Sequence, residues 1–541
     1  MNALGLVLLI ATPATPLVML ALCGSQARRD FLSSCLWIAP LPALGAALMT
    51  IGGQSSAFAA PAIGYTLFID KVAGVLLLVV AILWIGAGLA AARREARDVR
   101  FSVCWMLTMA GSFGVFVAAD LLTFYLLYAL VSIPAFGLIM RNGDAASKRA
   151  AGVYMAFTIL GEAFLLAAFA LLAAGEPNGS LQIHDVIAAL PGSPWRDGAL
   201  ALIIASFGLK IALVPMHGWM PLTYTAAPLP AAAALSGAAV KAGVIGLIRF
   251  LPFDTALPDW GEALAAVGFI SAFYGVAVGI TQHNLKTVLA YSSISQMGVI
   301  AAVMGMGLAS AIPGTALDSA VYAAHHVLVK GALFLSIGVA AVASQKYRPL
   351  VMWLSAIMAL SLAGLPMTGG WLAKLVVKAP LGDGIAGTLA DLSAAATTLL
   401  MLHFLMLLAR MAQQSPQTKT QVAIDASWLA LAISSVVVPW LLYPVVVGGL
   451  GEALTASAIF KSLWPVLFGA ALAYGLRPWD HRLLSVPEGD IINLMEAAFR
   501  ASLRLGETFE RLDLRLRQWP AATISLGIIA LLLAAAARAS R

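Results

Sequence analysis

Residues 208–215 read Gly-Leu-Lys-Ile-Ala-Leu-Val-Pro, which puts a lysine and then a proline near the end of a long apolar stretch. A lysine at the centre of a bilayer costs roughly 2.5 to 3.5 kcal/mol on insertion scales. A proline removes one backbone hydrogen bond from a helix. Both survive in a membrane only where other protein or an aqueous cavity satisfies the exposed polar groups. The stretch therefore predicts an interrupted membrane helix with Lys210 facing the protein interior.

A second stretch of the same kind lies further along the chain. Gly364-Leu365-Pro366 is followed by Gly369, Gly370 and Lys374, so a proline and paired glycines again precede a lysine. We take Pro215, Pro366, Gly369 and Gly370 as the residues that break the two helices. Interrupted helices at corresponding places in two halves of a chain indicate an ion site built on internal repeats. The two lysines lie about five expected spans apart, which predicts two inverted five-helix repeats.

The composition determines the class of the molecule. The chain has 541 residues, of which 61% are hydrophobic and 11% charged, and its mean hydropathy is +0.93. These values exclude a water-soluble globule. Apolar segments of about 20 residues, the length that crosses a bilayer, recur along the chain. We expect an all-α polytopic membrane protein with about 14 to 16 transmembrane helices and no soluble domain.

The spacing of these segments predicts the organisation of the chain. Basic residues follow the first apolar segment instead of preceding it, so we expect a retained span and not a cleaved signal. The predicted regions, in order, are N-terminal helices at 1–100, a first repeat at 101–250, a second repeat at 251–413, additional spans at 414–483, a cytoplasmic amphipathic helix at 484–519 and a final span at 520–541.

The positive charges also follow a pattern. Alternate loops between spans carry most of the lysine and arginine: Arg28, Arg29, Arg93, Arg94, Arg97, Arg100, Arg141, Lys148, Arg149, Lys286, Lys346, Arg348, Arg410, Lys419 and the Arg-rich stretch 477–517. The positive-inside rule then places these loops in the cytoplasm and the N-terminus outside. We expect a multi-pass protein of a bacterial-type inner membrane. The net charge of +7 reflects this topology, so no nucleic-acid partner is expected.

The cysteines do not indicate a redox or metal site. Cys23, Cys35 and Cys104 lie within or beside spans and lack a CxxC spacing. A disulfide framework, a zinc site and an iron–sulfur cluster bound by this chain are therefore not expected. We expect neither a metal nor a cofactor.

Other charged residues lie inside expected spans, and each has an ordinary alternative. Lysines near a helix end can extend to the headgroups, an alternative that applies to Lys210 and Lys374 and most strongly to Lys378. The histidines at 325, 326 and 403 can be neutral, hydrogen-bonded packing residues. A lysine in a poorly solvated site can release its proton nearer to neutral pH than an exposed lysine, which suits proton transfer.

Several of these residues stand in motifs that resemble one family. The motifs are Pro215-Met-His217-Gly-Trp219-Met-Pro221, Ala227-Pro228-Leu-Pro230, Ser236-Gly237 to Lys241, Asn284-Leu285-Lys286 to Gly298, His326 with 330–334, and Gly364-Leu365-Pro366 with Lys374. Together they resemble the antiporter-like proton-channel subunits of respiratory complex I, energy-converting hydrogenases and Mrp-type sodium/proton antiporters. The resemblance covers roughly residues 100 to 410.

The resemblance implies a mechanism and a setting. It implies a proton relay along the membrane midplane through Lys210, Lys241, His326, Lys330 and Lys374. It also implies a translocating subunit without a redox centre of its own, whose partners are other membrane subunits, the lipid bilayer and protons, with sodium as the alternative ion.

The chain departs from the family pattern at informative places. The fifth helix of pumping members carries a glutamate that pairs with the lysine matched by Lys210, and here that position is Ala129. Lys210 is then more easily deprotonated, or it finds another anion, for which Glu162 and Asp120 are the candidates. The usual tenth-helix histidine is Gln296, and a further position near His326 is Tyr322. These replacements remove titratable groups from the relay.

The C-terminal region predicts a long amphipathic helix. Apolar residues recur at spacings of three and four from Ile491 to Leu516, opposite a face rich in arginine and glutamate. Such a helix suits either lipid headgroups or a partner subunit.

Two alternatives to a proton-translocating subunit remain: a membrane subunit of a proton-coupled inorganic-carbon uptake system, and a non-conducting structural scaffold.

Overall fold

The computed structural model confirms an all-α polytopic membrane protein, to which it adds one β-hairpin. It describes residues 3–24, 31–32, 34–60, 64–92, 95–414, 425–451, 453–476, 486–516 and 519–539. The chain divides into two compact units, Met1–Glu488 and Gly489–Arg541. Among the predicted basic loop residues, eight lie outside the described residues: Arg28, Arg29, Arg93, Arg94, Lys419, Arg477, Arg482 and Arg517.

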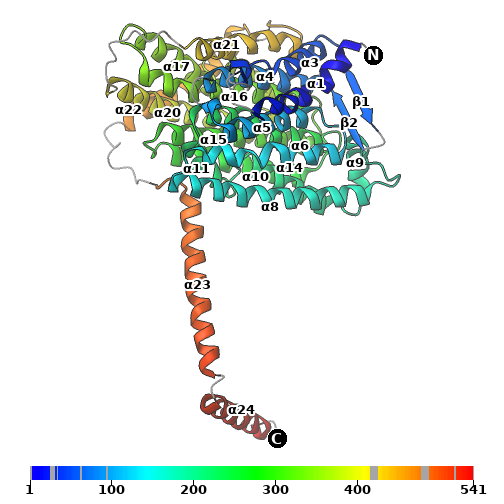
Figure 1. Cartoon of the computed structure of the whole chain (residues 1–541), viewed down its shortest axis with the longest axis vertical. Coiled ribbons are helices and arrows are strands. Elements are labelled where there is room, and N and C mark those ends of the chain that lie inside the picture. Colours follow the sequence, from blue (N-terminus) through cyan, green and yellow to red (C-terminus); the bar gives the residue numbers. More distant parts are fainter. Residues whose placement is uncertain are drawn as a thin grey trace. The chain divides into compact units, whose positions relative to one another are not determined.

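The first unit holds the candidate site. Its elements are α1 (Ala3–Met19), η1 (Leu20–Gly24), α3 (Leu41–Ile51), β1 (Ser56–Ala60), β2 (Tyr65–Ile69), α4 (Lys71–Ala91), η3 (Glu95–Arg97), α5 (Val99–Val117), α6 (Leu121–Ser132), α7 (Ala135–Ile139), η4 (Met140–Asn142), α8 (Ala145–Gly175), α9 (Ile183–Ala189), η5 (Leu190–Gly192), α10 (Arg196–Lys210), α11 (Trp219–Ala226), α12 (Leu229–Ala234), η6 (Leu235–Ala239), α13 (Lys241–Phe250), α14 (Pro258–Gly279), α15 (Leu285–Ser310), α16 (Thr315–Val342), α17 (Arg348–Ala363), α18 (Gly369–Val376), α19 (Lys378–Leu381), α20 (Ile385–Gln414), α21 (Ala426–Val447) and α22 (Ala456–Leu476). Figure 1 shows most of these helices running side by side in one bundle.

The described residues contain 12 helices that are long and apolar enough to cross a membrane. The other expected spans correspond to shorter helices. The expected span 31–51 is reduced to α3, which begins after Pro40. The expected spans 198–216 and 350–380 end early or divide, at α10 and between α17 and α18. Proline and glycine interruptions therefore shorten or divide three of the expected spans.

The two expected helix breaks are present in the backbone. Helix α10 ends at Lys210, Ala212 has a φ of 60°, and α11 begins only at Trp219. Helix α17 ends before Gly364, whose φ is 87°, and α18 begins at Gly369. Positive φ values are left-handed and cannot continue a right-handed helix. Each break therefore leaves backbone groups that need partners inside the bundle.

The centre of the bundle is tightly packed. The most apolar stretch of 18 residues in Leu229–Phe250 is entirely buried, and so is the corresponding stretch of helix α15. Helices α14 and α15 touch through glycines: a Cβ added at Gly268 would meet the backbone nitrogen of Ala302 at 2.6 Å. Small residues let membrane helices approach closely where their backbones cross. This central pair supports the helices that carry the candidate site.

The hairpin lies where the sequence analysis expected only a connection between spans. Strands β1 and β2 pair antiparallel, with Ser56 opposite Ile69. Aromatic and β-branched residues at 65–69 favour a strand. The hairpin continues into neighbouring segments, because Leu67 bridges Ala118. In Figure 1 the hairpin lies at the same end of the bundle as α9.

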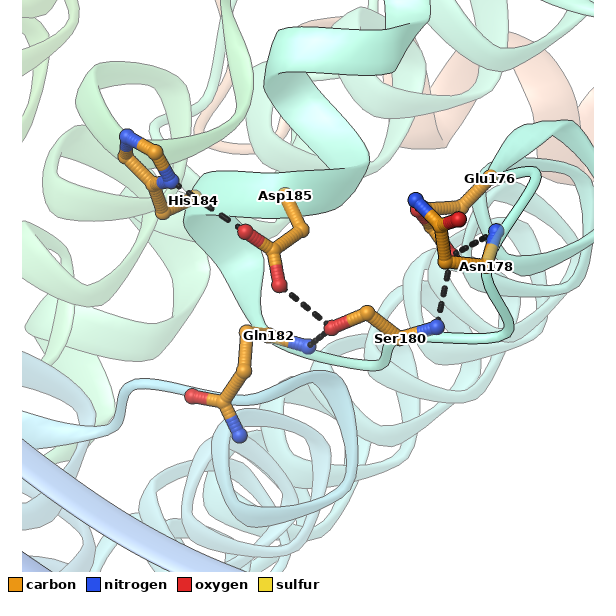
Figure 2. A network of polar contacts seen from close by, with 6 residues as sticks. All are labelled: Glu176, Asn178, Ser180, Gln182, His184 and Asp185. Atoms are coloured by element: carbon orange, nitrogen blue, oxygen red, sulfur yellow. Dashed lines mark hydrogen bonds and ion pairs between the residues drawn. The ribbon is translucent and has the colours of Figure 1, made fainter.

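The loop between α8 and α9 is closed by a polar network, which Figure 2 shows. The carboxylate of Glu176 accepts the backbone N–H groups of Asn178 at 2.9 Å and Ser180 at 2.6 Å. The Ser180 hydroxyl donates to Asp185 at 2.5 Å. Ser180, and then His184, lower the pKa of Asp185, so the carboxylate persists at mildly acidic pH. The network fixes the loop that carries Gln182.

A paired charge ties the first helices to the centre. The guanidinium of Arg249 on α13 donates to Asp70 at 2.6 and 3.0 Å. Asp70 also accepts the N–H of Ala73 and so caps α4. A bidentate arginine–carboxylate pair is directional as well as strong. It therefore sets the register of α4 against α13.

The second unit contains α23 (Asp490–Leu516) and α24 (Trp519–Ala539). Helix α23 has the expected opposed faces, with ion pairs at helical spacing between Glu496 and Arg500 and between Glu507 and Arg511. Its apolar face includes Leu494 and Phe499, which are 70% and 63% exposed within the described chain. The predicted amphipathic helix is therefore present, and its placement on a membrane surface stays a prediction.

Candidate functional site

Lys210 lies at the break that follows α10, and its side chain is buried, with 5% exposure. Its Nζ donates to the hydroxyl of Ser132 on α6 at 2.7 Å. The same nitrogen lies 5.3 Å from the ring centre of Tyr128 and 5.9 Å from that of Tyr154. Aromatic faces attract a cation but cannot accept its proton. The surroundings of Lys210 are therefore protein, and the side chain does not extend to the lipid boundary.

Glu162 on α8 is the carboxylate near Lys210. Its side chain is 8% exposed, interacts electrostatically with Lys210 and contacts the Ser132 hydroxyl. Within the part of the chain that the structure describes, its Oε1 has no hydrogen-bond partner. The Ser132 hydroxyl, which donates to the carbonyl of Tyr128 at 2.8 Å, accepts from Lys210 and lies near the carboxylate. This geometry supports Glu162 as the replacement for the glutamate missing at Ala129.

Asp120, the other suggested carboxylate, lies elsewhere. It caps α6 by accepting the N–H and hydroxyl of Thr123 at 2.7 Å each, and it accepts the N–H of Thr66 at 2.8 Å. These bonds use its oxygens at the far end of α6 from Ser132. Twelve residues of helix separate the two, which is about 18 Å. The suggestion that Asp120 partners Lys210 is therefore wrong, because an N-cap position holds it.

Lys241 begins the helix that follows a π-helical turn, η6. Single π turns inside helices occur often at functional sites because they rotate the next side chain out of register. Lys241 is fully buried. Its Nζ lies 3.0 Å from Nδ1 of His326 and 3.8 Å from Sδ of Met297. Both contacts are with neutral or titratable groups, and neither is a carboxylate.

Lys330 lies one helical turn after His326 on α16, so the two side chains share a face. Its Nζ donates to the carbonyl of Leu289 at 2.9 Å, and the side chain is fully buried. It interacts electrostatically with Lys241. In the described residues, His326 leaves its Nε2 without a hydrogen-bond partner. We refer to Lys241, His326 and Lys330 as the central cluster.

Small cavities lie on both sides of Lys210. One of about 10 Å³ is lined by Ser132, Thr158 and Lys210 together with aromatic residues. A second of about 10 Å³ is lined by Lys210, Thr223, Ala239 and Val240, next to Lys241. Each volume is about the minimum for one water molecule. In the described segments the hydroxyls of Thr223 and Ser236 are buried without partners. Unpartnered buried hydroxyls are the groups that ordered water satisfies.

Lys374 lies on α18, across the second break. Its Nζ donates to the carbonyl of Ala363 at 2.6 Å, which is one of the carbonyls left open where α17 ends. It also interacts electrostatically with Asp391 on α20. The side chain passes over Gly364, where an added Cβ would meet its Cδ at 2.7 Å. The break therefore holds the lysine inside the bundle.

His325 connects this break with the central cluster. It is 5% exposed, and its Nε2 lies 2.8 Å from the hydroxyl of Ser361 on α17. The imidazole interacts electrostatically with Lys374 on one side and with His326 on the other. Added Cβ atoms at Gly369 and Gly370 would meet this ring at 3.2 and 2.8 Å. The paired glycines therefore make room for the ring as well as breaking the helix.

The replacements Gln296 and Tyr322 form one neutral network. The hydroxyl of Tyr322 donates to Oε1 of Gln296 at 2.8 Å. Nε2 of Gln296 donates to the hydroxyl of Thr397 at 3.1 Å, which donates to the carbonyl of Ser393 at 2.8 Å. All three side chains that donate are buried. The two departures from the family motifs are therefore coupled through a hydrogen bond.

The structure brings together some of the predicted residues and separates others. It brings Lys241, His326 and Lys330 together, places Glu162 near Lys210 and places Lys374 near His325. Ser132 and Ser361 were not among the residues predicted from the sequence, and His325 was not part of the predicted relay. A serine gives no sequence signal of its own, because its role depends on contacts between helices.

A larger cavity reaches one end of the bundle. It has a volume of about 520 Å³ and is lined by Arg141, Lys286, Pro228, Leu335 and Gly338 among others. Leu335 lies five residues after Lys330 on α16, about 7.5 Å along the helix. Water at this cavity therefore comes within about two turns of the central cluster.

The described residues hold no group of three or more His, Cys, Asp or Glu side chains placed to bind a metal ion.

Residues 118–381 match the family model described as NADH:quinone oxidoreductase/Mrp antiporter, transmembrane. This range includes Lys210, the central cluster and Lys374.

Curated relatives come from respiratory and hydrogenase enzymes. NADH-quinone oxidoreductase subunit N of Desulforudis audaxviator is 31% identical over 58% of this chain and 66% of its own length. Hydrogenase-4 component B of Escherichia coli is 29% identical over 42% of this chain and 36% of its own. NAD(P)H-quinone oxidoreductase chain 4 2 of Thermosynechococcus vestitus is 30% identical over 52% of each. The chain thus spans between about a third and two thirds of these relatives.

Two solved structures share the fold. A chain of the Mrp complex from Dietzia sp. superposes with a TM-score of 0.76 at 22% identity, covering 99% of this chain and 63% of that chain. A chain of the archaeal membrane-bound sulfane sulfur reductase superposes with a TM-score of 0.64 at 20% identity, covering 85% and 100%. At these identities the likeness concerns the fold alone.

Proposed function

We propose that this chain, which belongs to the family of antiporter-like membrane subunits of NADH:quinone oxidoreductases and Mrp antiporters, moves protons across a membrane along its buried lysines. We call Lys210, Lys241, Lys330 and Lys374 the lysine row. The proposal includes its work as one subunit of a larger membrane assembly, because the relatives are named as components or subunits of such enzymes.

The central cluster carries this proposal. Two lysines and one histidine are fully buried in helices that have the length and composition of membrane spans. Within the described residues, their hydrogen-bond partners are a carbonyl, a thioether and each other, so no carboxylate there fixes the charge. Like charges in a poorly solvated site repel strongly. A proton shared among three basic groups is therefore mobile, which is what a relay requires.

The flanking groups support a continuous route. Lys210 exchanges its proton through Ser132 and Glu162, and the water-sized cavity beside Thr223 leads from Lys210 toward Lys241. The cavity of about 520 Å³ brings water toward Lys330 from the end that carries Arg141 and Lys286. The positive-inside rule assigns this end to the cytoplasm. The N-terminus then lies outside a bacterial-type inner membrane.

The test removes the lysine furthest along the row. The native assembly is isolated through a tag on this chain and placed in liposomes. A potassium diffusion potential drives protons into the liposomes, and a pH-sensitive dye inside them measures the flux. Lys374→Ala is expected to lower the flux about 100-fold, since a positioned proton-transfer group contributes 10² to 10⁴.

The matched control is Lys378→Ala. Lys378 is a nearby lysine with 52% side-chain exposure, paired with Asp383 at 3.6 Å. Its replacement is expected to leave the flux unchanged. Water solvates the charge of an exposed lysine, so this residue is not expected to take part in proton transfer inside the helix bundle. Equal flux in the wild type and the Lys374 variant would instead favour a non-conducting scaffold.

A further inference from the structure

We propose that protons pass from the central cluster to Lys374 through His325 and Ser361, and that the Tyr322–Gln296–Thr397 network is a polar clamp that does not conduct. The inference rests on the proposed function and specifies its route. Two series of hydrogen-bonded side chains begin on α16 near His326, one at His325 and the other at Tyr322. The contacts alone therefore allow two routes for a proton that leaves the central cluster.

The first way consists of groups that can both take and release a proton. An imidazole that receives a proton at Nδ1 can release the one at Nε2, and so change tautomer. The Nε2 of His325 lies 2.8 Å from the Ser361 hydroxyl. The Ser361 oxygen also accepts the N–H of Gly370 at 3.0 Å. One lone pair and the hydroxyl proton therefore remain for transfer.

The position of Ser361 leads onward to Lys374. Ser361 lies two residues before Ala363, whose carbonyl holds the Lys374 ammonium group. The proposed step uses one water molecule between Ser361 and Lys374, which takes the hydroxyl proton of Ser361 as the hydroxyl receives the proton of His325. That water then gives its own proton to an uncharged Lys374. Each group ends with as many protons as it began with, except His325, which has lost one, and Lys374, which has gained one.

Electrostatic interactions agree with this order. His325 interacts with Lys374 and with His326, and so links the two ends. His326 in turn lies 3.0 Å from Lys241. In the described residues Nε2 of His326 is buried without a partner, and it faces no fixed hydrogen bond that would hold its proton. The imidazole is therefore free to exchange its proton on the side away from Lys241.

The second way is closed by its chemistry. Every donor in it points one way, from Tyr322 to Gln296, from Gln296 to Thr397, and from Thr397 to the carbonyl of Ser393. A carboxamide passes a proton only by becoming an imidic acid, and a backbone carbonyl cannot pass one on. With all members satisfied, such a network rigidifies the core. It clamps α15, α16 and α20 beside the route.

The test removes one buried hydroxyl from each chain. Ser361→Ala is expected to lower the liposome proton flux at least tenfold, and Tyr322→Phe to leave it within twofold. Ser361→Thr restores the hydroxyl and is expected to recover at least half of the flux, which a purely structural loss would not predict. His325→Gln keeps a hydrogen-bonding side chain but removes the titratable ring, and its flux is expected to match that of Ser361→Ala.

The outcomes separate this inference from the proposed function. Flux blocked by Lys374→Ala but untouched by Ser361→Ala and His325→Gln would overturn the route alone. Flux lowered by Tyr322→Phe as much as by Ser361→Ala would also overturn it. Flux unchanged by Lys374→Ala would overturn the proposed function first. The melting temperature and the yield of assembly are measured for each variant, and His325→Gln decides if Ser361→Ala does not assemble.

Discussion

Replacing Glu162 with alanine is expected to lower the proton flux about 100-fold. The carboxylate is the buried anion that interacts with Lys210, and Ser132 alone would remain. Removing one partner of a buried charge pair costs roughly 3 kcal/mol or more, and each 1.36 kcal/mol corresponds to a factor of ten. The charged form of Lys210 would then be too rare to pass protons at the normal rate.

The matching rescue moves the carboxylate to α6. Ala129 lies three residues before Ser132, so the two positions share a helix face. The double variant Ala129→Glu/Glu162→Ala is expected to recover a substantial part of the flux, because the anion again lies beside Lys210. Liposome flux for the single and double variants is the measurement. Full flux in Glu162→Ala would show that Lys210 does not depend on this carboxylate. No recovery in the double variant would show that a carboxylate on α6 cannot replace the one on α8.

Replacing Gly370 with alanine is expected to prevent stable folding of the second break. An added Cβ would meet the carbonyl oxygen of Ser361 at 1.7 Å and a ring carbon of His325 at 2.8 Å. The backbone of α18 would have to move away from α17, at a cost of about 3 kcal/mol or more. The melting temperature of the detergent-purified assembly, and the share of chain that assembles, measure the loss.

The control for this change is Gly384→Ala. Its added Cβ would meet no described atom within 4 Å, so little change in melting temperature is expected. Equal melting temperatures for the two variants would contradict the close contact between α17 and α18.

Single residues explain how much of the fold could be predicted. A lysine in an apolar segment must be enclosed whatever the details, and Lys241 and Lys330 are fully buried as expected. Proline and glycine act on the local backbone, so the breaks after Lys210 and before Lys374 could be located from the sequence. The helix breaks depend only on the local backbone, and the burial of the lysines follows from the cost of placing a charge in the apolar bilayer.

Tertiary contacts explain what could not be predicted. Glu162 lies nearer to Lys210 along the sequence than Asp120 does, but which of the two approaches the lysine depends on how α6, α8 and α10 pack. The π turn before Lys241 has no strong sequence signal. Nor could the sequence show what His325 contacts, because it lies next to His326 on α16 and faces another side of the helix. Only the arrangement of α18 shows that His325 faces the second break.

The hairpin illustrates the same limit. Residues 65–69 have the composition of a strand, yet a single strand is informative only with its partner. Its partner β1 is rich in alanine and gives a weak strand signal. The hairpin became evident only from the pairing of the two segments.

Proton flux through the assembly with Lys241→Met tests the central claim most directly. Methionine keeps a long, flexible side chain in the buried site but has no group that accepts a proton. We expect the liposome flux to fall about 100-fold while the assembly still forms and melts near its normal temperature. Wild-type flux through a well-assembled Lys241→Met protein would contradict the claim that protons cross the membrane along the lysine row.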